Sequence, residues 1–350
     1  MVFHQAVQRL LLLGADLEPP GPGEAQPPAP PPRRLAPLVE AISTTQQRFN
    51  QRAVQFGNRY RSGFWAVYLL SALAVLCAVL PLALEWRRPG NTSDLHTSVS
   101  MWAVAEAIII GTVITVYWRG HRHDWHGEWL RARTTAALTG YLPLLSPLLN
   151  FDKPDGEANW YVRAFNPGQH LPTLDDVGNM CARIEPLARE LVLNAWSEPL
   201  FVSNYARWTL DILDRQRRHH LDIVRTQRAL LQRIHAINVA LFGMTFLAGI
   251  LYLALHAVWL SLFATFFPAL GASLYGALAQ SEAYRLGTTS TRLAEDLDIA
   301  AKRIQAAAGL PDGGNIPVLK AEIEKALALI LEEYQDWSLL IRPQRLPMAG

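Results

Sequence analysis

The sequence predicts an all-α membrane protein with four transmembrane helices in two hairpins and long cytoplasmic helical extensions. Four apolar stretches are each long enough to cross a bilayer, and aromatic and arginine side chains flank them. The polar stretches between them show no alternating pattern that would predict strands. Half of the 350 residues are hydrophobic and 18% are charged, below the usual quarter of soluble proteins.

The four predicted spans are residues 64–84, 101–118, 236–255 and 258–280. A bilayer core requires about 17–25 mostly apolar residues in helical form. A buried soluble core would explain one such run, but four of them favour membrane spans. The two hairpins are then 64–118 and 236–280, and the only charged side chain inside the four spans is that of Glu106.

Flanking residues predict the orientation. Aromatic residues of an interfacial belt stand at the span ends: Trp65, Trp86, Trp102, Tyr117, Trp118 and Trp259. Arginines precede spans 1 and 3 and follow spans 2 and 4: Arg48, Arg52, Arg59, Arg61, Arg119, Arg122, Arg131, Arg133, Arg225, Arg228, Arg233, Arg285 and Arg292. The positive-inside rule therefore places both termini and residues 119–235 in the cytoplasm, which we expect to be that of a bacterium with the chain in its inner (plasma) membrane.

The chain divides into five segments by composition: 1–34 with a proline-rich linker at 19–34, 35–118, 119–235, 236–280 and 281–350. A helix is predicted from near Leu35 through Arg61 into the first span. Prolines and glycines between Pro154 and Pro172 predict short helices and loops there. Residues 203–235 contain neither proline nor glycine, so we expect one long helix that continues into the third span.

The C-terminal segment predicts two further helices. Residues 281–308 continue the fourth span, and Asn315 before Ile316 and Pro317 is typical of a helix start. The last helix carries a seam of coiled-coil type: Ile316, Ile323, Leu327, Ile330, Tyr334 and Trp337. This seam predicts packing either against the long helices of the same chain or against another subunit.

Span 4 contains residues expected to shape helix packing. Pro268 should kink it, because proline lacks the N–H that the helix ladder requires. Small residues follow the proline and allow a neighbouring helix to approach: Ala269, Gly271, Ala272, Ser273 and Gly276. They predict packing within the four-helix unit, with a subunit contact as the alternative.

Span 2 contains the candidate pore-lining residues. Glu106 lies five residues from the start of the span, where it can snorkel or remain protonated, or face a water-filled interior that attracts cations. Thr112 and Thr115 on the same span could hydrogen-bond across helices. Because one chain of four spans makes little pore by itself, a conducting role predicts a homo-oligomer.

Motifs for catalysis, cofactors or metals do not emerge. The sequence contains no GxGxxG, P-loop lysine, HExxH, CxxC or GxSxG pattern, so we expect no enzyme and no cofactor. His121, His123 and His126 lack the four-residue spacing of a helical metal pair and favour a basic, aromatic collar at the membrane surface over a metal site. A net charge of +2 gives no argument for nucleic acid.

Two further histidines, His219 and His220, stand beside Arg215, Arg217 and Arg218. Their pattern favours a solvated face, and binding of an acidic partner or a nucleotide is the alternative. Cys77 and Cys181 are too few for a disulfide framework, and Cys77 lies in an apolar run as a small hydrophobic residue.

An ordered set of features over residues 35–300 resembles the SLATT family, bacterial four-helix membrane effectors associated with the SMODS and SLOG nucleotide-linked systems. These features are Arg59-Tyr60-Arg61-Ser62 with Tyr68, Trp125-His126 with Trp129, Trp160-Tyr161-Val162-Arg163, the helix 203–235, FFPALGASLYG at 266–276, and Gln280-Ser281-Glu282-Ala283-Tyr284-Arg285.

The resemblance implies a membrane effector of antiviral defence that opens or disrupts the bilayer on a nucleotide-linked signal, with no fixed catalytic residues. Larger relatives carry a Rossmann-like sensor domain, and only some 34 residues precede the first long helix here. We therefore expect sensing by a partner protein that senses or makes nucleotides, or by the cytoplasmic helices. The alternative function is a membrane scaffold that recruits soluble partners through helices 203–235 and 316–337.

Overall fold

The structure is a computed structural model that describes residues 3–12, 29–83, 92–148, 173–281, 283–309 and 316–340. Within these ranges all regular elements are helices, so the all-α prediction is confirmed there. Several predictions fall outside the described residues: the linker at 19–28, the breaks between Pro154 and Pro172, the Trp160–Arg163 motif, Trp86, the Asn315 cap, and the side chains of Tyr334 and Trp337.

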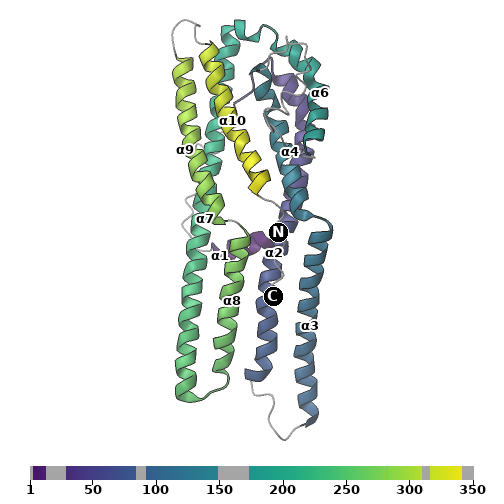
Figure 1. The fold of residues 1–350 in the computed structure, drawn as a ribbon, viewed down its shortest axis with the longest axis vertical. Helices are drawn as coiled ribbons and strands as arrows, with labels where there is room; N and C mark the ends of the chain where they lie inside the picture. The colour runs from purple at the N-terminus through teal and green to yellow at the C-terminus, as the bar shows by residue number, and fades with distance from the viewer. Residues whose placement is uncertain are drawn as a thin grey trace.

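Two very long helices organise the molecule. Helix α2 (Ala36–Ala83) has 48 residues and α7 (Pro199–Leu255) has 57. At 1.5 Å per residue they measure about 72 and 86 Å, more than twice the thickness of a bilayer core. Both helices run from a polar bundle into an apolar segment without interruption (Figure 1). The predicted continuity of 35–61 with span 1 and of 203–235 with span 3 is therefore confirmed.

Each long helix has an antiparallel neighbour in the apolar half. Helix α3 (Thr92–Arg122) lies beside α2, and α8 (Leu260–Gln280) lies beside α7 (Figure 1). Four helices among the described residues are long and apolar enough to cross a membrane, and they include the predicted spans except for Leu84 at the end of the first and residues 258–259 at the start of the fourth. The turn after α7 is short, because His256 adopts a left-handed φ of 51° and donates its N–H to the Tyr252 carbonyl at 2.9 Å.

The polar half is a bundle around one large core. It contains the first part of α2 and of α7 together with α4 (Trp125–Leu145), α6 (Thr173–Val192), α9 (Ala283–Ala308) and α10 (Ile316–Leu340). Helix α4 has 21 residues and ends before the prolines and glycines that begin at Pro154. The buried Tyr205 hydroxyl donates to the Leu144 carbonyl at 2.5 Å and so ties α7 to α4.

The apolar seam of α10 faces this core. Ile323, Leu327 and Ile330 are buried in the same cluster as residues of α7 and α9. This part of the seam therefore packs within its own chain, as in the first of the two arrangements that its spacing predicts.

A second, smaller core lies where the bundle meets the apolar helices, and we call it the junction cluster. It joins α2, α7 and α8 through Phe64, Trp65, Leu230, Ile234, Leu274, Ala277 and Leu278. Trp65 has no exposed surface, so its assignment to an interfacial aromatic belt is wrong. The residue lies on the face of α2 that meets the other helices, whereas Trp118 and Trp259 are exposed at 56% and 50%.

The short helix α1 (Phe3–Leu11) packs on the junction cluster through Val7 and Leu11 (Figure 1). His4 is buried, and its ring Nδ1 lies 3.2 Å from the Ser62 hydroxyl on α2. Burial, with a smaller contribution from the Arg61 charge, lowers the pKa of His4 from 6.5 to about 4. The imidazole is therefore neutral at physiological pH.

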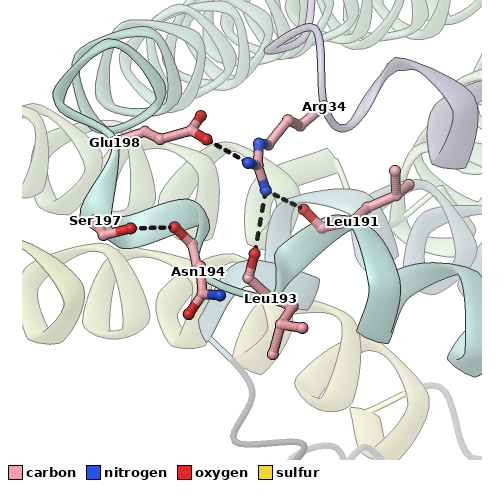
Figure 2. Close-up of polar contacts among 6 residues, drawn as sticks. All are labelled: Arg34, Leu191, Leu193, Asn194, Ser197 and Glu198. Atoms are coloured by element: carbon pink, nitrogen blue, oxygen red, sulfur yellow. Dashed lines mark hydrogen bonds and ion pairs between the residues drawn. The ribbon is translucent and has the colours of Figure 1, made fainter.

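Arg34 fastens the residues before α2 to the end of α6. Figure 2 shows its guanidinium directed at the carbonyls of Leu191 and Leu193 and at the carboxylate of Glu198. The bonds to the two carbonyls measure 3.4 and 3.1 Å. A cation at this position satisfies carbonyl groups that have no partner inside the helix and complements the negative end of its dipole.

We expect Arg34→Ala to lower the free energy of unfolding by about 1 kcal/mol, because the mutation removes charge-assisted bonds at a partly exposed site. Thermal unfolding of the full chain in a neutral detergent measures the change. Arg33→Ala, which alters the exposed neighbouring arginine, is the control. Equal losses in both variants would contradict a specific role for Arg34.

We also expect the docking of α1 to weaken on acidification. Because folding lowers the pKa of His4, the undocked form takes up a proton first as the pH falls below 6.5. The stabilisation is complete above pH 6.5 and is lost as the pH falls to about 4. Amide hydrogen exchange of residues 3–11, corrected for its intrinsic pH dependence, should report this loss. His4→Gln should abolish it and His123→Gln should preserve it; an unchanged profile in His4→Gln would refute the assignment.

Candidate functional site

The candidate pore residues belong to α3, the most exposed of the apolar helices. None of the residues in its apolar window is buried. Its half-buried residues form the stripe that faces α2: Trp102, Ala105, Glu106, Ile109, Val113, Val116, Tyr117 and Gly120. Glu106 therefore lies on the side of α3 that meets α2.

Thr112 and Thr115 lie on the exposed part of α3. Their hydroxyls donate to carbonyls of the same helix, Thr112 to Ile108 at 2.8 Å and Thr115 to Gly111 at 2.7 Å. Within the part of the chain that the structure describes, these two hydroxyls therefore bond inside α3 and not across helices as expected. Nine residues separate Glu106 from Thr115, which at 3.6 residues per turn places them on opposite sides of α3. The three candidates do not share one face.

The small residues of α8 let two helices approach closely. A methyl group added at Gly276 would lie 2.5 Å from the Tyr68 ring on α2, and one added at Gly271 would lie 2.8 Å from Asn238 Oδ1 on α7. Ser273 is buried as well, Ala269 is half-buried and Ala272 is exposed. Gly271 and Gly276 thus make their close contacts within the chain. Pro268 lies inside α8, eight residues after its start.

An aromatic and basic group surrounds α2 just before its apolar segment. The Tyr60 ring lies 4.7 Å from the His126 ring and stacks on Trp129 at 6.0 Å. Arg61 lies over Trp129 at 5.8 Å. Burial lowers the pKa of His126, although the nearby Asp124 acts in the opposite direction. These contacts place the expected collar residues around the start of the apolar part of α2.

The three histidines at the end of α3 and just after it do not converge. His121 stacks on Tyr117 at 6.4 Å, His123 is exposed, and His126 packs on Tyr60. In the part of the chain that the structure describes, no three His, Cys, Asp or Glu side chains are grouped as metal ligands.

The prediction of a solvated face at His219 and His220 is half wrong. His219 is exposed, but His220 is buried with its Nδ1 3.3 Å from the Ser290 hydroxyl on α9. Consecutive helical residues point about 100° apart, so one of the two turns toward α9 while the other faces away. Arg217 of α7 also pairs with Asp298 of α9 at 3.4 Å. Lys302 and Arg217 hold the pKa of the Asp298 carboxyl below its usual value.

Two polar residues of the apolar helices join neighbouring helices; sequence analysis named Gln280 only as part of the motif at the end of span 4 and did not point to Asn238. Asn238 is buried between α7 and α8. Gln280 at the end of α8 donates to the Tyr60 hydroxyl at 2.9 Å and joins α8 to α2. Placing an amide side chain in lipid costs free energy, so an amide in an apolar span usually faces other helices. The position of Asn238 within 236–255 could therefore have predicted its burial between helices.

Comparisons with known protein families, with curated proteins and with solved structures find no match for this chain.

We expect Gly276→Ala to destabilise the protein by about 1–3 kcal/mol, because the added methyl group forces the Tyr68 ring out of its packing position. Gly249→Ala on α7 is the matched control, since no atom lies within 4 Å of the added group. Thermal unfolding in detergent compares the two variants. Equal stability would show that Tyr68 yields freely and that the close contact is unimportant.

Proposed function

We propose that this chain is a multi-pass effector of the bacterial inner membrane that permeabilises it after oligomerisation or on a signal. The two helix pairs α2–α3 and α7–α8 act as transmembrane hairpins in this proposal. The bundle and both termini lie in the cytoplasm, on the side where the flanking arginines gather.

The observation that carries the proposal is the isolation of α3. Helices α2, α7 and α8 share the junction cluster, whereas α3 packs mainly on α2 and leaves its other faces uncovered (Figure 1). Lipid can cover these faces in a single copy, and a helix of a second copy can replace that lipid without breaking any contact inside the chain. An assembly around α3 would supply the additional helices that a pore requires.

The scaffold alternative has less support. It relied on the seam of α10 as a free surface, and the buried part of that seam lies in the bundle core, where α10 packs on α9 and α4 of the same chain. In this proposal the signal acts on the bundle while α10 stays in place. Either a partner protein linked to nucleotide sensing binds the bundle, or the bundle binds the signal molecule directly.

Expression of the chain with its signalling partners should depolarise bacterial cells, measured with a potential-sensitive dye; a preserved potential at confirmed expression would refute the effector proposal.

In reconstituted vesicles, we expect Glu106→Gln to reduce the preference for cations over anions, because the carboxylate attracts cations. Asp222→Asn, which neutralises an exposed carboxylate in the bundle, should leave the preference unchanged. Identical selectivity in wild type and Glu106→Gln would remove Glu106 from the conducting path.

A further inference from the structure

A cavity of about 700 Å³ lies in the polar half between α2, α4 and α7. Its size is that of a small-molecule pocket. Among the described residues that line it are three arginines and a histidine but no aspartate or glutamate. The ends of the cavity are marked on α2 by Gln46 and Arg61, 15 residues or about 22 Å apart along the helix.

One wall carries two cations close together. Arg61 from α2 and Arg133 from α4 both line the cavity, and the Arg61 Nε donates to the Gly57 carbonyl at 3.2 Å. Burial and the positive charge of Arg133 lower the pKa of Arg61. Two like charges partly removed from water are costly to hold together, and an anion between them offsets that cost.

The opposite wall belongs to α7 and supplies hydrogen-bond donors. Arg215 is paired with Asp211 at 2.6 Å, so it adds donors but little net charge. His219 and Gln216 lie on the same wall. A ligand in the cavity would therefore contact α2 and α4 on its charged side and α7 on its polar side.

The aromatic lining does not favour a stacked ring. Trp129 is already stacked by Tyr60 and overlaid by Arg61, so its faces are occupied within the chain. Arginine forks match phosphate oxygens, and they bind multivalent anions better than single charges. We propose that the cavity between α2, α4 and α7 binds a small polyanion that carries phosphate groups, through Arg61 and Arg133.

Phosphate at this position has two possible sources. Arg61 stands three residues before Phe64, close enough to the apolar segment to meet a lipid headgroup, whereas the Gln46 end lies about 22 Å further along α2. A soluble ligand can occupy the whole length of the cavity, but a lipid headgroup would occupy only the end that is marked by Arg61.

Calorimetric titration of the full chain in a neutral detergent with sodium tripolyphosphate tests the proposal. We expect saturable binding of one equivalent, and a tenfold to hundredfold loss of affinity, roughly the loss of a charge-assisted bond, in Arg61→Gln and in Arg133→Gln. Arg131→Gln is the matched control, because Arg131 is exposed on the same helix as Arg133 and pairs with Glu128 outside the cavity.

Absence of saturable binding, or an equal loss in Arg131→Gln, would overturn the proposal. Repeating the titration in phosphatidylcholine nanodiscs with and without phosphatidic acid identifies the source. Unchanged affinity supports a soluble ligand, and competition by phosphatidic acid that depends on Arg61 supports a headgroup at the same site. Binding is measured without any conductance, so its failure would leave the proposed membrane activity untouched.

Discussion

The junction cluster is the contact on which the rest of the structure depends. Phe64 and Trp65 of α2 meet Ile234 of α7 and Leu274 of α8 at the level where polar sequence gives way to apolar sequence. Above this level, side chains of the bundle bury their apolar stripes against one another. Below it, the apolar helices have few buried residues, so the mutual positions of α2, α7 and α8 depend on the cluster. The close approach of Gly276 to Tyr68 and the bond from Gln280 to Tyr60 reinforce the same connection.

The long helices could be predicted because their signals are local. The proline- and glycine-free stretch 203–235 and the apolar run that follows it specify one helix, and the structure contains it as part of α7. The seam of α10 was predictable as an apolar stripe, but its partner was not, since packing on the chain itself and packing on a neighbour require the same spacing. Only the three-dimensional arrangement distinguishes the two.

The features that depend on several helices were out of reach. The cavity between α2, α4 and α7 joins Gln46, Arg133 and His219, which are separated by 87 and 86 residues in the sequence and approach one another only after these helices have packed. The burial of Trp65 and of His220 has the same origin. By contrast, the opposite directions of Glu106 and Thr115 follow from helical geometry alone, and a helical projection of the second apolar stretch would have revealed them.

The uninterrupted course of α7 has a mechanical consequence. Its contacts in the junction cluster, Leu230 and Ile234, divide it into arms of about 46 Å towards Pro199 and about 32 Å towards Leu255. The bundle core holds the first arm through Tyr205 and Leu213, and the junction cluster holds the helix again at Leu230 and Ile234. A displacement of the bundle as a whole is therefore carried directly into the apolar arm of α7.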